Sequence, residues 1–170
     1  MSNHSANEHK AHAPSSIGCM VITCSDTRTP ETDTSGQLIR KLLEERGHTV
    51  VGYHLVKDDP PQIQLWIARG TANEAVQAII INGGTGISRR DSTFEAVDAM
   101  LEKRLAGFGE IFRLLTFQDI GSPAIMSRAT AGVINGRVLF STPGSENAVR
   151  LAMEKLILPE LGHLIRELTK

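Results

Sequence analysis

The stretch AVQAIIINGGTGISRRDS, residues 75–92, determines the fold class of this chain. Its first half, residues 75–82, contains the purest apolar run in the chain and is rich in isoleucine, which is typical of a strand buried within a sheet. Its second half is a polar loop in which Gly83, Gly84 and Gly86 are three glycines within four positions. A buried strand that ends in such a loop and leads into a helix is typical of a parallel α/β sheet.

Strands and helices alternate on both sides of this stretch. The dipeptide Asn135-Gly136 predicts a type I′ hairpin turn, because both residues tolerate a positive φ angle. We therefore expect a three-layer αβα sandwich with a mostly parallel sheet and one antiparallel edge pair, formed by a single domain over residues 17–170. The expected strands are residues 18–24, 48–56, 75–82, 133–134 and 138–141; the expected helices include Leu38 to Leu43 and residues 60–69, 92–103 and 107–118, then a helical turn at 127–131 and a final helix from Glu146 with a new segment at Pro159.

Two capping boxes are expected at helix starts. Asp59 with Gln62 would cap the helix that begins at Pro60, and Ser92 with Glu95 would cap the next one. Both predictions rest on local spacing alone.

Composition excludes several classes of protein. The chain has 170 residues, 41% hydrophobic and 22% charged, with a formal net charge of -1. This balance gives no bulk attraction to nucleic acid or acidic membranes, and no apolar run approaches the ~18 residues of a membrane span. Cys19 and Cys24 lie an odd number of positions apart, so they face opposite sides of a strand and do not pair. Residues 1–16 are polar and predict a disordered tail without a secretory signal, and we expect a cytoplasmic protein.

Four polar loops follow expected strand ends: SDTR (25–28), VKDD (56–59), NGGTGISRRD (82–91) and STPGS (141–145). Because the carboxyl ends of parallel strands meet at one edge of a sheet, these loops predict a ligand site there.

The glycine loop predicts phosphate binding. Gly83, Gly84, Thr85 and Gly86 would present bare backbone N–H groups at the start of a helix, and Arg89 adds a forked cation for phosphate oxygens. The loop lacks the Gly-Lys-Ser/Thr ending of a Walker A motif and the last glycine of a dinucleotide fingerprint. A tight turn without a ligand is the plain alternative.

Carboxylates near these loops have two interpretations each. Asp91 would hold Mg²⁺ with substrate phosphates, or would only provide a favourable charge at the helix start. Asp58 would be a functional residue or a solvated one. Asp26 is ambiguous. Ser35 would be a ligand contact, or else Asp33 or Ser35 would simply cap the helix that follows.

The loop STPGS predicts a second anion site. Pro143 and Gly144 form a stiff turn that exposes a helix N-terminus, whereas Ser145 is also a plain N-cap candidate.

These motifs together resemble the MoaB/MogA molybdopterin-binding family. NGGTGISRRD, VKDD upstream and STPGS downstream match the family's pattern, SDTRTPETDTSG fits its first loop, and GFGEIFRLLTFQDIGSPAIMSRATAGVINGRVLF is similar to the MoaB branch. The resemblance covers about residues 17–161. It implies a six-stranded α/β sandwich, assembly as a trimer or hexamer, and a place in molybdenum cofactor synthesis.

The resemblance also implies chemistry. MogA-type proteins transfer AMP from ATP to the terminal phosphate of molybdopterin with Mg²⁺, and the family's two essential aspartates match Asp58 and Asp91. Arg90-Asp91 is retained, which favours an enzyme. The resemblance extends a binding role to the residues of the three loops, namely Gly83, Gly84, Thr85, Gly86, Arg89, Pro143, Gly144, Ser145, Asp26 and Ser35.

Three functions are compatible with these residues. The first is a molybdopterin adenylyltransferase. The second is a non-catalytic molybdopterin-binding or scaffold protein, and the third is an unrelated nucleotide-binding domain that reuses the fold.

Overall fold

The computed structural model describes residues 14–170, so most of the expected tail, residues 1–13, lies outside the described residues. A six-stranded sheet in the order β2-β1-β3-β6-β5-β4 forms the middle of the molecule. β1, β2, β3 and β6 are parallel, and β5 runs antiparallel to both β6 and β4. The mixed sheet confirms the predicted topology. The strands are β1 (Gly18–Cys24), β2 (Thr49–Val56), β3 (Ala78–Asn82), β4 (Lys103–Arg104), β5 (Thr130–Ile134) and β6 (Arg137–Thr142).

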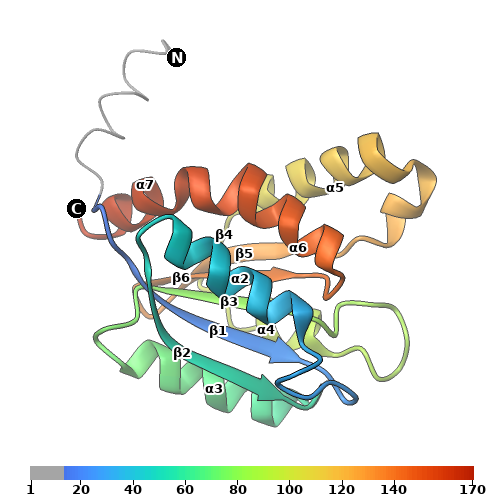
Figure 1. Cartoon of the computed structure of the whole chain (residues 1–170), viewed down its shortest axis with the longest axis horizontal. Helices are drawn as coiled ribbons and strands as arrows, with labels where there is room; N and C mark the ends of the chain where they lie inside the picture. The colour runs from blue at the N-terminus through green and yellow to red at the C-terminus, as the bar shows by residue number, and fades with distance from the viewer. Residues whose placement is uncertain (1–13) are drawn as a thin grey trace.

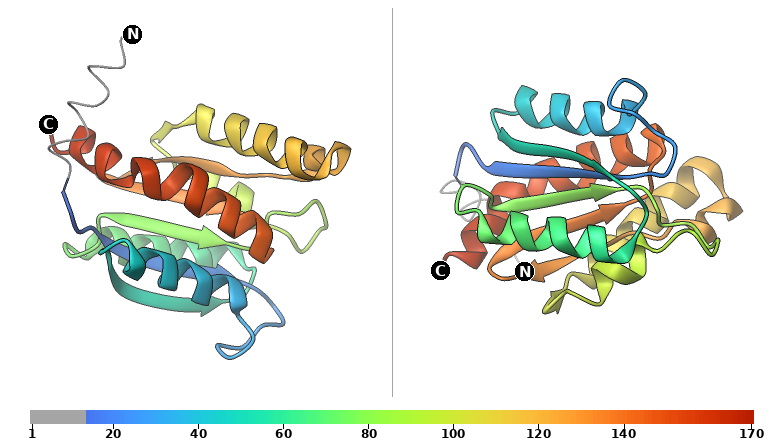
Figure 2. Two further views of the ribbon diagram at one scale, coloured as in Figure 1. Left: turned by 45° about the horizontal axis from the view of Figure 1, so that its top comes forward. Right: turned by 90° about the horizontal axis from the view of Figure 1, so that it is seen from below.

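Helices cover both faces of this sheet (Figure 1). α2, α5, α6 and α7 pack on one face and α3 and α4 on the other, as the rotated views also show (Figure 2). The predicted three-layer sandwich is therefore confirmed. The helices are α2 (Thr34–Glu45), α3 (Pro60–Ala72), α4 (Thr93–Asp98), α5 (Ala106–Ile120), the 3-10 helix η1 (Ser122–Met126), α6 (Glu146–Ala152), the π-helical η2 (Met153–Ile157) and α7 (Leu158–Leu168).

Strand alternation divides the apolar core into two clusters. Cys19 and Val21 of β1 belong to the cluster under α2, α5, α6 and α7, while Ile22 and Cys24 belong to the cluster over α3 and α4. The alternation follows from the two-residue period of a strand. Both cysteines are buried and free, which confirms that they do not pair.

Two local predictions hold at the end of the chain. Asn135 and Gly136 have φ angles of 46° and 69° and join β5 to β6 as a hairpin. Pro159 lies in the first turn of α7, which continues directly from the π-helical η2, so a new helical segment does begin at the proline.

Other predictions were wrong at element boundaries. β3 begins at Ala78 instead of Ala75, and α3 continues to Ala72 instead of ending at Arg69. The helical turn expected at 127–131 lies earlier, at residues 122–126, and Thr130 already belongs to β5.

The helix expected to reach Lys103 ends at Asp98. Lys103 and Arg104 instead form the edge strand β4, which pairs with β5. Arg104 also donates to both carboxylate oxygens of Asp98, at 2.9 and 3.0 Å. These contacts with β5 and Asp98 favour an extended backbone at Lys103 and Arg104.

Neither predicted capping box forms. Asp59 and Ser92 occupy the N-cap positions of α3 and α4, but neither side chain accepts a hydrogen bond from its helix. Within residues 14–170, no helix is long and apolar enough to cross a membrane.

Candidate functional site

The carboxyl ends of β1, β3 and β6 surround a cavity of about 450 Å³. It lies where the predicted loops converge, which confirms that segments far apart in the sequence meet at one edge of the sheet. The lining consists of Cys24, Ser25, Thr27, Arg28, Gly83, Gly84, Thr85, Gly86, Asp91, Pro123, Met126, Ser127, Pro143 and Gly144.

The glycine loop after β3 requires its glycines. Gly83 and Gly84 have φ angles of 98° and 59°, which side chains rarely adopt. A Cβ on Gly83 would lie 2.2 Å from the Cys24 carbonyl oxygen, and one on Gly84 would lie 2.1 Å from Oδ2 of Asp58. The loop therefore packs directly on β1 and on the loop that follows β2, with its backbone against the cavity.

Asp58 lies beneath this loop. Its Oδ1 accepts hydrogen bonds from the backbone N–H of Ser92 at 3.1 Å, the Ser92 hydroxyl at 2.9 Å and the Thr93 hydroxyl at 3.2 Å. These bonds explain why Ser92 does not cap α4 with its side chain. Among residues 14–170, no hydrogen bond reaches Oδ2 of Asp58, so that oxygen is unpaired and lies against Gly84.

Asp91 lines the cavity itself. Its Oδ2 accepts from the backbone N–H of Ser88 at 3.0 Å, and a Cβ on Gly86 would lie 2.6 Å from the same oxygen. No described residue donates to Oδ1. Asp91 therefore also keeps one oxygen available beside the glycine loop.

The donor set fits a hard cation that substrate oxygens complete. Mg²⁺ is usually held by one or two carboxylates together with substrate phosphates. Asp58 and Asp91 each keep one unpaired oxygen near the loop, as described above. The described part of the chain holds no group of three His, Cys, Asp or Glu side chains that would bind a metal by itself. Any bound Mg²⁺ would therefore depend on the ligand.

The second loop contacts the first. A Cβ on Gly144 would lie 2.9 Å from the Gly83 Cα, so the two backbones approach as closely as glycine permits. Pro143 and Gly144 line the cavity, whereas Ser145 accepts a hydrogen bond from the Ala148 N–H at 3.3 Å as the N-cap of α6. The cap interpretation of Ser145 is thus confirmed, and a contact with a ligand remains a prediction.

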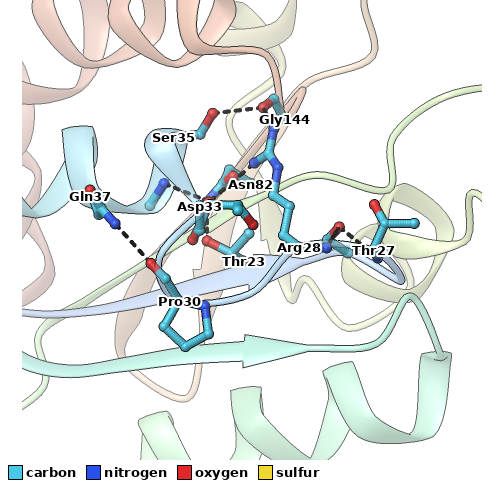
Figure 3. A network of polar contacts seen from close by, with 12 residues as sticks. Thr23, Thr27, Arg28, Pro30, Asp33, Ser35, Gln37, Asn82 and Gly144 are labelled. Carbon is cyan, nitrogen blue, oxygen red and sulfur yellow. Dashed lines mark hydrogen bonds and ion pairs between the residues drawn. The ribbon is translucent and has the colours of Figure 1, made fainter.

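Ser35 supports the second loop from behind. Its side chain is buried, and its hydroxyl donates to the Gly144 carbonyl oxygen at 2.8 Å (Figure 3). The cap of α2 is Asp33, whose Oδ1 accepts from the Gly36 N–H at 3.0 Å. Ser35 is not part of the cavity lining, so it stabilises the loop on which a ligand would rest.

Arg28 is a cavity residue that the sequence analysis did not single out. It lines the cavity and donates to Asp33 at 3.1 Å and to the Gly144 carbonyl oxygen at 2.8 Å. A basic side chain in the SDTR loop after β1 was a usable signal, because that loop ends at the predicted edge of the sheet.

The structure does not bring Arg89 to the cavity. Its side chain is exposed, and it is not part of the lining. Asp26 also lies outside the lining and pairs with Arg90 at 2.5 Å, while its Oδ1 accepts from the Asp58 N–H at 3.3 Å. The hydrogen bond from Arg90 holds the pKa of Asp26 below its ordinary value. Asp26 therefore connects the loops after β1, β2 and β3.

Arg128 fixes the glycine loop from the opposite side. It donates to the carbonyl oxygens of Thr85 at 2.8 Å and Gly86 at 2.6 Å, and it pairs with Glu95 at 2.5 Å. Its guanidinium also lies 4.8 Å from the ring centroid of Phe94. The carbonyl oxygens of Thr85 and Gly86 therefore point toward Arg128.

Cys24 is the thiol at the cavity, and burial raises its pKa to about 12. It is therefore protonated near neutral pH and is a poor nucleophile. The cavity therefore gains no reactive thiolate from Cys24 near neutral pH.

Fold and site together define an α/β domain with two contacting glycine-containing loops that line one cavity at its strand ends. The family model described as a probable molybdopterin binding domain matches residues 20–163. The chain is 54% identical to the molybdenum cofactor biosynthesis protein B of Halalkalibacterium halodurans and 54% identical to that of Bacillus subtilis, each over 98% of both chains.

Solved structures give the same result. A crystal structure of molybdenum cofactor biosynthesis protein B has a TM-score of 0.90 and 54% identity, covering 93% of this chain and 99% of that one. The tungsten cofactor synthesizing protein MoaB from Pyrococcus furiosus has a TM-score of 0.83 and 34% identity, covering 93% and 100%. The chain belongs to the molybdenum cofactor biosynthesis protein B family, and its role is in molybdenum cofactor biosynthesis.

Proposed function

We propose that this protein binds molybdopterin and transfers AMP from Mg-ATP to its terminal phosphate. The observation that carries the proposal is the contact between Gly83 and Gly144, which places two anion-binding loops side by side on one cavity. A reaction that joins two phosphate-bearing molecules requires such a pair of sites. The available oxygens of Asp58 and Asp91 support a cation site beside them.

The reaction needs little covalent chemistry from the protein. A terminal phosphate oxygen of molybdopterin attacks the α-phosphorus of ATP, the bond from that phosphorus to the bridging oxygen breaks, and pyrophosphate leaves. Because a phosphate monoester is already largely ionised near neutral pH, no strong general base is required. Catalysis then rests on positioning and charge neutralisation, as in other phosphoryl transfers.

Each side of the cavity has a distinct part in this scheme. The backbone of Gly84 to Gly86 binds phosphate oxygens of one substrate, and the turn at Pro143 and Gly144 with the start of α6 binds those of the other. Asp58 and Asp91 would hold Mg²⁺, which would neutralise the charge of the triphosphate.

The test is to incubate the purified protein with molybdopterin, MgCl₂ and labelled ATP and to measure adenylylated molybdopterin. We expect product from the wild type and a loss of about 100-fold or more in Asp91→Asn. Glu44→Gln is the matched control, since Glu44 is exposed near the C-terminal end of α2 and is not part of the cavity lining. An unchanged rate in Asp91→Asn would contradict the metal role.

Two other outcomes would replace the proposal. Tight molybdopterin binding without ATP binding, with Mg²⁺ present, would indicate a non-catalytic binding or scaffold protein. ATP binding without molybdopterin binding would indicate an unrelated nucleotide-binding domain.

We also propose a homo-oligomer, a trimer or hexamer, as the family resemblance implies. Support comes from apolar side chains that α5 and η1 expose to solvent, and light scattering that gives a monomer would contradict it. The cytoplasmic location and the lack of nucleic-acid and membrane partners stay predictions. The exposed apolar residues of these two helices are Ile111, Leu114, Phe117, Ile120, Ile125 and Met126.

A further inference from the structure

Arg28 differs from the other charged residues around the cavity. Among residues 14–170, it is the one cationic side chain of the lining, and Asp91 is the one anionic side chain. It follows β1 and reaches across the sheet edge to the second loop, as the close view shows (Figure 3). Arg28 and Asp91 therefore give the two sides of the cavity opposite charges.

The guanidinium of Arg28 is held in a fixed position. Asp33 is fully buried and accepts from Nη1 of Arg28 at 3.1 Å, while the Gly144 carbonyl oxygen accepts from Nη2 at 2.8 Å. Both bonds are charge-assisted on the donor side, which makes them stronger than bonds between neutral groups. An arginine anchored at two points retains little freedom to turn away from the cavity.

Asp33 is itself fixed on its other oxygen. The hydroxyl of Tyr53, which lies on β2, donates to Oδ2 of Asp33 at 2.6 Å. Burial, then the neighbouring Asp33 carboxylate, raise the pKa of Tyr53 above its ordinary value, so the hydroxyl remains a donor. Residues of three different elements therefore define where the guanidinium lies.

Arg28 still has donors to offer a ligand. A guanidinium carries five N–H groups, and two of them are used within the described residues, at Asp33 and Gly144. The side chain is 27% exposed, which leaves part of it open to the cavity. An ion pair with no binding role would not need to leave donors at a cavity surface.

We propose that Arg28 is a substrate-binding residue that binds phosphate oxygens beside the second loop, with Asp33 and Tyr53 as positioning residues. The proposal rests on the proposed function only for the identity of the molecule whose phosphate Arg28 binds. The fork of a guanidinium matches two phosphate oxygens at once, which a lysine ammonium does not. Fixed in this way, Arg28 aligns the phosphate with the molecule on the glycine loop.

The first test measures binding of inorganic pyrophosphate, without metal, by calorimetry. We expect Arg28→Gln to weaken binding about 10-fold and Arg28→Lys to fall between it and the wild type. Arg46→Gln is the matched control, because Arg46 is exposed at the opposite end of α2 and carries the same charge. Thermal unfolding checks that each variant is folded. If Arg28→Gln is not folded, Arg28→Lys alone is compared with the wild type.

Wild-type affinity in Arg28→Gln, or no pyrophosphate binding by the wild type, would overturn the binding role. Weakened binding together with no adenylylated product from the wild type would refute the proposed function and leave Arg28 as an anion-binding residue. The two failures are therefore distinguishable.

The second test separates positioning by Asp33 from simple electrostatics. Asp33→Asn removes a negative charge, so electrostatics alone would tighten pyrophosphate binding, whereas loss of positioning weakens it about 3-fold. In the Arg28→Gln background the same change should have no further effect on affinity. Tighter or unchanged pyrophosphate binding in Asp33→Asn would overturn the positioning role of Asp33. If Asp33→Asn does not fold, Tyr53→Phe is measured in its place.

Discussion

The two loops that meet at the cavity are held in different ways. Side chains from the segments after β2 and before β5, chiefly Asp58 and Arg128, fix the glycine loop. The second loop rests on the buried start of α2 and on Arg28. The glycine loop lies beside two carboxylates and the second loop beside a cation, so the cavity has a side suited to a metal ion and a side suited to an anion.

The largest effect is expected from removing a carboxylate on the glycine-loop side. Asp58→Asn should lower the rate of AMP transfer about 100- to 1,000-fold, because it removes a charge that would face the cation. Stability should fall less, since an amide oxygen still accepts hydrogen bonds from Ser92 and Thr93. Asp98→Asn, at the end of α4 and outside the cavity lining, should keep the rate, and equal rate losses in both variants would contradict the prediction.

Adding a methyl group to the same loop should have the next largest effect. Gly84→Ala is expected to lower the free energy of unfolding by about 3 kcal/mol, from backbone strain at positive φ and a clash with Asp58 and Thr93. Gly136→Ala is the control, since it has a φ of 69° and nothing within 4 Å of the new Cβ. Denaturant unfolding of both variants separates clash from strain, and equal losses would show that the clash is absent.

Loss of Arg128, which holds the glycine loop, should have a smaller effect on stability. Arg128→Ala is expected to cost about 1–2 kcal/mol in unfolding free energy and to weaken pyrophosphate binding, because the glycine loop loses two carbonyl contacts. Arg104→Ala removes a similar pair on the far edge and should leave pyrophosphate affinity unchanged. Calorimetry compares the pyrophosphate affinity of the two variants. Unchanged affinity in Arg128→Ala would argue against a role of Arg128 in positioning the loop.

The smallest effect is expected at the second loop. Ser145→Ala removes the N-cap of α6 and should lower the unfolding free energy by about 1 kcal/mol, measured by denaturant titration. Asn147→Ala, exposed in the same turn, should stay within about 0.5 kcal/mol of the wild type. A change at Ser145 no larger than at Asn147 would show that the cap bond contributes little.

Local patterns predicted the elements that depend on local physics. The apolar run that ends at Asn82 and the Asn135-Gly136 turn need no distant partner to be recognised. The strand at Lys103 and Arg104 was missed because two exposed basic residues extend only by pairing with β5. The cap at Ser92 was mispredicted because Asp58, 34 residues away, takes its hydroxyl.

The candidate site divides in the same way. The glycine loop and Asp91 were predictable, because strand-end loops of a parallel sheet converge on one edge. The position of Arg28 depends on Gly144, 116 residues away, and only the folded chain reveals it. Arg89 is exposed outside the lining, since proximity in sequence to the glycine loop does not direct a side chain toward the cavity, and its binding role stays a prediction.

The pairing of β3 with β6 sets the spacing of the two loops. Asn82 lies opposite Thr142, so both strands end at the same level and their loops begin together. A one-residue insertion in either strand would shift one loop by about 3.3 Å along the sheet, more than the length of a hydrogen bond. The pairing of β3 with β6 thus fixes the distance between two phosphates bound at the ends of these strands. Insertions and deletions are therefore expected to be tolerated at the opposite ends of β3 and β6, not within them.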